Sequence, residues 1–310
     1  MKLSIIIASW NTRELLEQCL AGVYRFLSSL APEVIVVDNG SCDGSAALVR
    51  ERFPRTMLIE NKENSGPVKA NNQGAAISHG EYLLFMNTDV FLFDSSLEDM
   101  VRYLDDNPAI GVVGPQLLDA EGEMQPSSYA FPAVRDEAYK NFYFLLKLLS
   151  AGRPVASAEL SAPCLVDWVP TACFLVRRDV YQALDGFDEY FFMYCDDVDF
   201  CHRLRKKTPY RVLFHPLAQA VHVGGASTPG AEDEKLKNIQ VLKMMLGNWH
   251  HYFRKNRGWM IWLVVKKIEI AASVIRILVA MIRLCNLYKI RHKLLIARYE
   301  LYKIKFNIFG

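Results

Sequence analysis

The sequence predicts an α/β fold, in which a mostly parallel sheet carries helices on both faces and is followed by a basic, apolar helical extension. Short β-rich apolar runs alternate with helical segments, which is the pattern of a parallel sheet covered on both faces. Residues 253–310 hold 13 Lys and Arg against 2 Asp and Glu, a net charge of +11, whereas residues 1–252 have a net charge of −9. The basic C-terminal part therefore suggests an anionic partner, either a membrane surface or a nucleic acid.

The expected elements follow from apolar runs and from the turn residues between them. Runs of four to eight apolar residues bounded by Gly, Asn, Asp and Ser favour buried strands. Longer periodic segments that begin at Thr or Ser favour helices. The expected strands cover 3–8, 34–37, 57–60, 82–86, 111–114, 165–176 and 210–214. The expected helices cover 13–26, 45–52, 66–79, 96–104, 137–149, 178–184, 198–206 and 259–281, with further helix after 284.

Polar groups follow three of these strands directly. They are Trp10-Asn11, Asp38-Asn39 and the Asn87-Thr88-Asp89 triplet. Ligands of open α/β sheets bind outside the carboxyl ends of the strands. We therefore expect these groups to converge on one cleft.

Three carboxylates lie within four positions near the start of a predicted helix: Asp196, Asp197 and Asp199. Adjacent carboxylates repel each other and burial disfavours their charge, so one of them with a raised pKa would suit a general base. The alternative is structural: Asp196 caps the helix, and the other two favour its positive end.

The C-terminal segment 259–281 is apolar, but Lys266, Lys267, Glu269 and Arg276 interrupt it. Charges in mid-span are costly in a transmembrane helix, and the uncharged runs are too short to cross a bilayer. The segment fits an interfacial helix on a membrane surface, or else terminal helices packed on the body. We expect one domain over 1–252, with halves meeting near 118, and a helical membrane-associating extension over 253–310.

Four stretches in this order resemble the family 2 glycosyltransferases of the GT-A fold, and among them the rhamnosyltransferase-like members of bacterial surface-polysaccharide synthesis. The stretches are 4–11, 37–45, 64–89 and 166–227. The resemblance implies a nucleotide-diphosphate sugar donor and a GT-A sheet. It identifies the family strongly and the particular sugar only weakly.

By this resemblance, the first half of the chain binds the donor. Asp38 would accept a hydrogen bond from the base, which suits the N–H of uracil or thymine. From its loop alone, the favoured interpretation of Asp38 is a turn-making residue. The donor-binding residues that the resemblance implies are Ser9, Asn11, Asp38, Asn64, Gly66, Asn72, Asn87 and Asp89.

The triplet Asn87-Thr88-Asp89 stands where the family has its Asp-x-Asp metal motif, with Asn in place of the first Asp. Asp89 would hold Mn²⁺ or Mg²⁺ against the diphosphate. His222 aligns with the family histidine that completes this site, and imidazole favours Mn²⁺. A lone histidine is otherwise more often structural, so its role rests on the resemblance.

The Asp-rich stretch matches the catalytic motif of the family. Asp197 falls on the general base, with Asp196 as the second candidate. Thr171 and Asp199 lie on the acceptor side, where Thr171 departs from the usual Gly. The absence of a Gln-x-x-Arg-Trp motif favours a non-processive enzyme.

The resulting hypothesis is an inverting, metal-dependent transferase that moves one sugar to a lipid-linked or glycan acceptor. dTDP-rhamnose is the favoured donor and a UDP-sugar the next. The enzyme would lie in the cytoplasm, peripheral on the inner face of the cytoplasmic membrane, without a nucleic-acid partner; the sequence leaves its oligomeric state open. Two alternatives remain: a catalytically silent sugar-nucleotide-binding subunit docked on the membrane, and a nucleotidyltransferase.

Overall fold

The computed structural model describes residues 1–148, 161–224, 239–282 and 290–309. The chain divides into two compact units, one formed by 1–131 with 157–228 and the other by 132–156 with 229–310. The two units are described separately below. The domain boundary expected after residue 252 stays a prediction.

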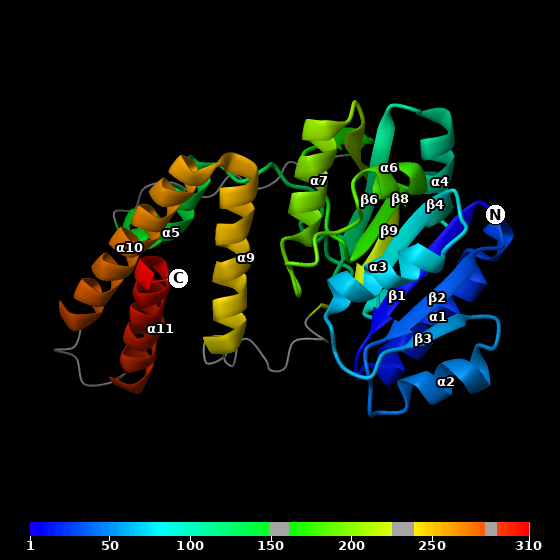
Figure 1. Cartoon of the computed structure of the whole chain (residues 1–310), viewed down its shortest axis with the longest axis horizontal. Helices are drawn as coiled ribbons and strands as arrows, with labels where there is room; N and C mark the ends of the chain where they lie inside the picture. The colour runs from blue at the N-terminus through cyan, green and yellow to red at the C-terminus, as the bar shows by residue number, and fades with distance from the viewer. Residues whose placement is uncertain (149–160, 225–238, 283–289, 310) are drawn as a thin grey trace. The chain divides into compact units, whose positions relative to one another are not determined.

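The first unit is built on one mixed sheet with the strand order β3-β2-β1-β4-β8-β6-β9-β5, in which β7 also pairs with β9 (Figure 1). The four strands β3, β2, β1 and β4 are parallel to one another. The strands are β1 (Leu3–Ser9), β2 (Glu33–Asp38), β3 (Met57–Glu60), β4 (Tyr82–Asn87), β5 (Val90–Phe91), β6 (Ile110–Leu118), β7 (Cys164–Val166), β8 (Cys173–Arg177) and β9 (Arg211–His222).

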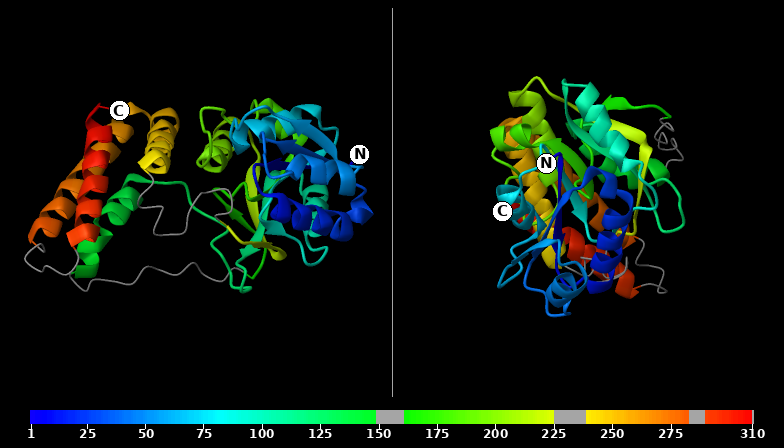
Figure 2. Two further views of the ribbon diagram at one scale, coloured as in Figure 1. Left: turned by 90° about the horizontal axis from the view of Figure 1, so that it is seen from below. Right: turned by 90° about the vertical axis from the view of Figure 1, so that its right-hand side faces the viewer.

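Helices cover both faces of this sheet, as the sequence predicts. Successive side chains of a strand point to opposite faces, so Ile5 and Ile7 of β1 join the core beneath α1 and α4, while Ile6 faces α3. A Cβ at Gly74 of α3 would come within 2.5 Å of the Ile6 side chain, so this glycine lets the helix approach the sheet. Figure 2 shows α1 and α3 on opposite sides of the strands. The helices of this unit are α1 (Arg13–Phe26), α2 (Ser45–Arg52), α3 (Pro67–Ile77), α4 (Leu97–Asp106), α6 (Arg178–Ala183) and α7 (Asp196–Lys207).

The expected single strand over 165–176 is wrong. The structure has two strands there, β7 and β8, which pair with different neighbours. The residues between them include Pro170, which has no N–H to donate to a ladder. Trp168 instead forms an isolated bridge with Tyr129. Thr171 therefore lies in the segment between the two strands, just before β8.

The expected end of a strand at His215-Pro216 is also wrong, because β9 runs on to His222. Its pairing with β6 shifts register between His215 and Gln219, so that Pro216 lies in the irregular segment. The Ala218 N–H donates to the His215 ring there, 3.1 Å away. This irregularity accommodates the proline and carries His222 to the far end of the sheet. The two-residue strand β5 was not predicted.

The second unit is helical and consists of α5 (Val134–Leu148), α9 (Ile239–Arg257), α10 (Trp259–Ile282) and α11 (Ile290–Phe309). Helix α10 packs against the other three. The expected end of the first of these helices at Leu149 lies outside the described residues, and α9 was not predicted.

Two of the charges that interrupt the apolar segment of α10 face the inside of this unit. Glu269 is 3.1 Å from the His250 ring and accepts a hydrogen bond from Asn307 at 2.8 Å. Arg276 pairs with Glu300 at 3.0 Å and also donates to the Asn141 carbonyl. Because each buried charge has a partner, the bundle accommodates them. No helix within the described ranges is long and apolar enough to cross a membrane.

Candidate active site

The predicted functional groups of the first unit lie at one edge of its sheet. In the register of the parallel strands, Ser9 pairs with Asp38, and Ala8 pairs with Asn87. Strand β8 is antiparallel to β4, so its start also lies at this edge, and the Asn87 N–H donates to the Ala172 carbonyl at 3.0 Å. Strand β9 reaches the same edge, where His222 pairs with Val90. The expected groups therefore lie at one edge of the sheet, while the cleft that they were expected to form stays a prediction.

Asp38 ends β2 with a buried carboxylate of which only one oxygen has a partner. Its Oδ2 accepts the Ser41 N–H at 2.9 Å, in the manner of a turn-making aspartate. Its Oδ1 is buried and has no hydrogen-bond partner. Buried polar atoms are nearly always paired, so such an orphaned oxygen calls for a ligand or a water. Asp38 thus makes the turn and still offers an acceptor.

Ser9 and Asn11 tie the loop after β1 to the loop after β2. Asn11 has a positive φ of 50°, and its side chain accepts the Cys42 N–H at 2.9 Å. The Asn11 N–H in turn donates to the Ser41 hydroxyl at 2.9 Å. The Ser9 hydroxyl is buried and lies 3.3 Å from that of Thr12. These bonds hold the two loops beside Asp38 in place.

The start of α3 is a tight turn formed by Asn64 and Gly66. The Asn64 side chain accepts the Gly66 N–H at 2.9 Å. Gly66 has a φ of +87°, and a Cβ there would lie 2.5 Å from the Phe192 carbonyl oxygen. Glycine is therefore required twice, by the backbone conformation and by the close approach. Asn39 completes the turn by donating to the Gly66 carbonyl at 3.2 Å.

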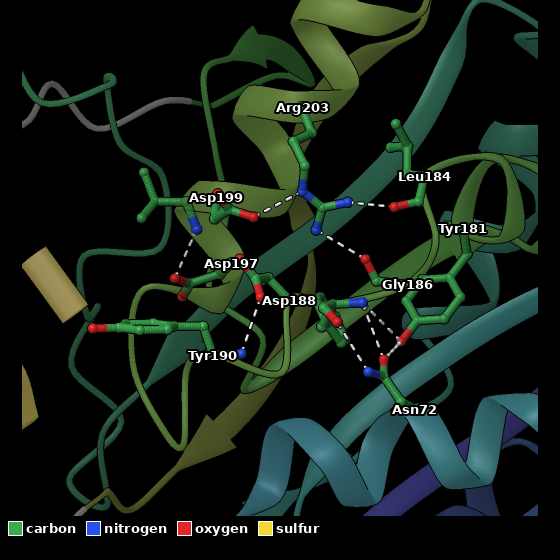
Figure 3. A network of polar contacts seen from close by, with 11 residues as sticks. Asn72, Tyr181, Leu184, Gly186, Asp188, Tyr190, Asp197, Asp199 and Arg203 are labelled. Atoms are coloured by element: carbon green, nitrogen blue, oxygen red, sulfur yellow. Dashed lines mark hydrogen bonds and ion pairs between the residues drawn. The ribbon is translucent and has the colours of Figure 1, made fainter. Parts of the chain in front are cut away.

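Asn72 of α3 holds the loop that leads to the Asp-rich stretch (Figure 3). Its amide nitrogen donates to the Phe187 carbonyl at 2.9 Å and to Glu189 at 3.1 Å. Its oxygen accepts the Phe187 N–H at 3.0 Å and the Tyr181 hydroxyl. These four bonds use the hydrogen-bonding capacity of the amide. In this structure Asn72 positions the loop, and its predicted contact with the donor stays a prediction.

Asp199 and Arg203 hold the same loop from α7. Arg203 donates to Asp199 at 2.8 Å and, with its other nitrogens, to the carbonyls of Leu184 and Gly186 (Figure 3). Both side chains are buried, so the pair is desolvated and its donors are directed at fixed acceptors. Asp199 therefore acts on the loop through Arg203, while the acceptor-side role predicted for it stays a prediction.

Asp196 and Asp197 form the first turn of α7 in two different environments. Asp196 is buried, and its Oδ2 accepts the Thr171 hydroxyl at 3.1 Å. Asp197 is half-buried, and its Oδ1 accepts the Val198 N–H at 2.8 Å. Burial raises the pKa of both carboxyls, and the charge of Asp196 raises the pKa of Asp197 further. Asp197 is thus the less buried member of the pair and the one whose pKa is raised further.

Asp89 and His222 face each other across the β5–β9 pair. The His222 Nε2 lies 3.6 Å from the Asp89 Oδ1, too far for a strong hydrogen bond but close enough for both atoms to bind one cation. Asn87 and Thr88 precede Asp89 at the same edge. No group of three or more His, Cys, Asp or Glu suited to a metal occurs in the part of the chain that the structure describes. A metal held here would take its other ligands from substrate or water.

A pocket of about 550 Å³ lies at the opposite ends of α7 and β9 and includes Leu204, Arg205 and Arg211 in its lining. None of the predicted site residues lines it. The chemistry-bearing groups instead gather at the start of α7 and the end of β9.

Two residues of the site were not among the predicted site residues. Asn39 also accepts hydrogen bonds from Asn61 at 2.9 Å and Ser65 at 3.2 Å, and so joins β2 to the start of α3. Gln125 contacts the His222 ring at 3.2 Å from 97 positions away. Asn39 belongs to the polar pair Asp38-Asn39 that was expected at this edge, although no contact was predicted for it, whereas no local signal singles out Gln125. Gly225 and Ser227, in the last stretch of the family resemblance, lie outside the described residues.

Comparison with known proteins addresses the family and the fold of the chain. Residues 4–146 match the family model described as glycosyl transferase family 2. This segment, a little under half of the chain, therefore matches a family 2 glycosyltransferase domain. The enzyme class predicted from the sequence is thereby confirmed.

Relatives of this glycosyltransferase include two rhamnosyltransferases. N-acetylglucosaminyl-diphospho-decaprenol L-rhamnosyltransferase of Mycobacterium tuberculosis is 28% identical over 225 residues, which are 66% of this chain and 72% of that protein. Rhamnosyltransferase WbbL of Escherichia coli is 27% identical over 143 residues, 46% of this chain and 52% of that protein. The rhamnosyltransferase-like resemblance predicted from the sequence is confirmed.

The solved structures identify the fold of the glycosyltransferase. The mannosyltransferase PcManGT from Pyrobaculum calidifontis, solved in complex with GDP-Man and Mn²⁺, has a TM-score of 0.57 at 19% identity and covers 99% of this chain and 87% of its own. At this identity the likeness concerns the fold alone. The predicted GT-A fold is confirmed.

Proposed function

We propose that this glycosyltransferase moves one sugar from a nucleotide-diphosphate sugar to a lipid-linked or glycan acceptor in cell-surface polysaccharide synthesis, with inversion at the anomeric carbon. The observation that carries the proposal is the convergence of three groups at one sheet edge: the orphaned oxygen of Asp38, the Asp89–His222 pair, and the half-buried carboxylate of Asp197 with its raised pKa. They match three needs of the reaction: to bind the nucleobase of the donor, to bind its diphosphate, and to accept the proton of the acceptor hydroxyl.

In this proposal Asp38 binds the nucleobase of the donor. Uracil and thymine carry a ring N–H, and an ionised carboxylate only accepts hydrogen bonds. The buried Oδ1 would gain the partner it lacks in the free protein. dTDP-rhamnose is the favoured donor because relatives are named as rhamnosyltransferases. A UDP-sugar satisfies the same carboxylate and is the second choice.

Asp197 serves as the base in this proposal. It takes the proton of the acceptor hydroxyl while that oxygen forms a bond to the anomeric carbon from the side opposite the diphosphate. The bond between the anomeric carbon and the diphosphate oxygen breaks with its electron pair, and the nucleoside diphosphate leaves. Asp196 keeps the hydrogen bond that it accepts from the Thr171 hydroxyl. Because Asp196 and Asp197 are adjacent carboxyls, they titrate as a pair.

A divalent cation fits Asp89 and His222. A carboxylate oxygen and an imidazole nitrogen are ligands that Mn²⁺ accepts, and Mg²⁺ would depend more on the carboxylate. When bound, the cation would stabilise the negative charge on the departing diphosphate. The protein's own part is to hold the two ligand atoms 3.6 Å apart on paired strands.

A thermal-shift panel tests the donor and the metal together. dTDP-, UDP- and GDP-sugars are each added with Mn²⁺ and with EDTA. A ligand at about 100 times its Kd adds about 2.7 kcal/mol of stability, so we expect a rise of several degrees in Tm for dTDP-rhamnose with Mn²⁺. EDTA should remove most of this rise. A panel without any shift, together with no nucleotide release in the presence of lipid-linked acceptors, would instead support a silent subunit.

The second unit supports the proposal of a peripheral membrane location. One face of α10 is exposed and almost entirely apolar, at positions spaced by three and four residues along the helix. This face consists of Met260, Val264, Lys267, Ala271, Val274 and Leu278. The surrounding chain is strongly basic, which favours an anionic lipid surface as its partner.

Charge placed on this face should release the protein from anionic vesicles. We expect Val264→Glu with Leu278→Glu to lower binding to phosphatidylglycerol-containing vesicles by at least about tenfold, because each substitution removes apolar burial of about 1.5–3 kcal/mol. Vesicle flotation of the full chain measures it. Met245→Glu is the matched control, since Met245 is also an exposed apolar residue of this unit, but on α9. Equal binding by the double variant and wild type would remove the α10 face as the docking surface.

A further inference from the structure

Gln125 lies against His222 and contacts it twice. Its amide nitrogen donates to the His222 carbonyl at 2.8 Å. Its amide oxygen lies 3.2 Å from the Nδ1 of the same ring. One side chain therefore holds both the backbone and the ring of this histidine.

The first of these contacts fixes the orientation of the amide. A carbonyl oxygen only accepts, so the group that faces the His222 carbonyl must be the NH₂ of Gln125. The amide oxygen is then the atom that faces Nδ1, and it too can only accept. The neutral ring must therefore carry its proton on Nδ1, where it donates to Gln125.

This protonation leaves the lone pair of the ring on Nε2. Nε2 is the atom that faces Asp89, at 3.6 Å. The backbone at this point is held as well, because His222 pairs with Val90 and the Val223 N–H donates to the Asp89 carbonyl at 3.1 Å. The free lone pair and the carboxylate thus face the same point from two sides.

We propose that Gln125 is a positioning residue, which holds His222 in the Nδ1–H tautomer so that Nε2 is available to a divalent cation shared with Asp89. Ligand histidines commonly donate their second nitrogen to such a partner, and loss of the partner costs 10- to 100-fold in metal affinity. This inference rests on the proposed metal-dependent function. It assigns a role to a residue of the segment between β6 and α5, where no site residue was predicted.

Two variants separate the roles of the amide. Gln125→Leu has a similar size but neither donates nor accepts. Gln125→Glu keeps an acceptor for the Nδ1 proton and loses the donor to the His222 carbonyl. Gln182→Leu is the matched control, because Gln182 is exposed on α6. Thermal unfolding of each full-length variant confirms that it is folded.

Two measurements are made on each protein. The tautomer of His222 is read without metal from ¹⁵N spectra of histidine-labelled protein, with the signal assigned by comparison with His222→Gln. Mn²⁺ affinity is then measured by electron paramagnetic resonance in the presence of dTDP or UDP. We expect wild type and Gln125→Glu to show the Nδ1–H tautomer. Gln125→Leu should lose it and bind Mn²⁺ about 10- to 100-fold more weakly.

An unchanged tautomer in Gln125→Leu would overturn the inference. A changed tautomer with unchanged Mn²⁺ affinity would overturn its metal-positioning part. Failure of the proposed metal dependence looks different, because wild type itself would then bind no Mn²⁺. In that case the metal-free spectra still decide whether Gln125 fixes the ring.

Discussion

Asp197→Asn should lower sugar transfer by about 10²- to 10⁴-fold, the usual contribution of a positioned general base. Asparagine keeps the size of the side chain and still accepts the Val198 N–H, but it does not take up a proton at neutral pH. Donor binding should survive, because the groups predicted to hold the donor lie on elements other than α7. The fall is therefore expected in kcat, with the thermal shift caused by the donor retained.

The pH profile gives a second readout of the same residue. Burial and the neighbouring Asp196 raise the pKa of Asp197, and only the deprotonated carboxylate is a base. The transfer rate should therefore rise with pH as this proton is lost, on the acid limb of the profile. The two carboxylates interact, so that limb belongs to the pair. Asp197→Asn should abolish it.

The same pKa shift predicts the effect on stability. A carboxyl whose pKa is raised on folding binds protons more tightly in the folded state, so it favours folding at low pH and opposes it as pH rises through the folded pKa. Removing that charge should leave Asp197→Asn at least as stable as wild type at neutral pH. A loss of transfer cannot then be attributed to unfolding.

Transfer assays on purified variants with a lipid-linked acceptor make the measurement. Asp185→Asn is the matched control, since Asp185 is exposed and its positive φ of 57° suits asparagine. Asp196→Asn tests the second candidate. If Asp196→Asn eliminates the acid limb and Asp197→Asn leaves it intact, the base is Asp196. An equal loss of donor binding and transfer in Asp197→Asn would remove its role as a dedicated base.

The parallel half of the sheet was predictable from the sequence because three of its four strands, β1, β2 and β4, are almost wholly buried runs, while β3 at the edge is a short apolar run with no fully buried residue. Residues 57–60 were predicted as the strand that the structure has there, and β1, β2 and β4 extend their predicted ranges by one or two residues. Burial on both faces selects β-branched and apolar residues at every position, so the signal is local. The polar residues that end these strands then locate the site through strand direction alone.

The other half of the sheet, where parallel and antiparallel pairs are mixed, was less predictable, because its geometry depends on partners distant in sequence. Strand β5 has only two residues, which form a strand because they pair with the end of β9. Pro216 signals the end of a strand, and only the pairing with β6 shows that an irregular segment accommodates it. The links from Thr171 to Asp196 and from Gln125 to His222 span 25 and 97 positions. No pattern within either segment indicates the other.

Asp89→Asn should lower both metal binding and transfer, the latter by about 10³-fold. A bound cation contributes several kcal/mol of charge stabilisation in the transition state, and each 1.36 kcal/mol corresponds to tenfold in rate. Asparagine keeps the shape of the side chain and one oxygen but loses the charge that attracts the cation. Since Asn87 is already neutral, Asp89→Asn leaves the triplet without any carboxylate.

The metal supplies its own test of this assignment. If Asp89 acts by holding a cation, high Mn²⁺ concentrations should restore part of the transfer rate of Asp89→Asn, and the donor-dependent thermal shift should require more Mn²⁺ than in wild type. Asp106→Asn makes the same change of charge at an exposed position of α4 and should match wild type. A transfer rate that falls equally at every Mn²⁺ concentration would mean that Asp89 acts without the metal. His222 would then be a structural histidine paired with it, because the same 3.6 Å contact carries both interpretations.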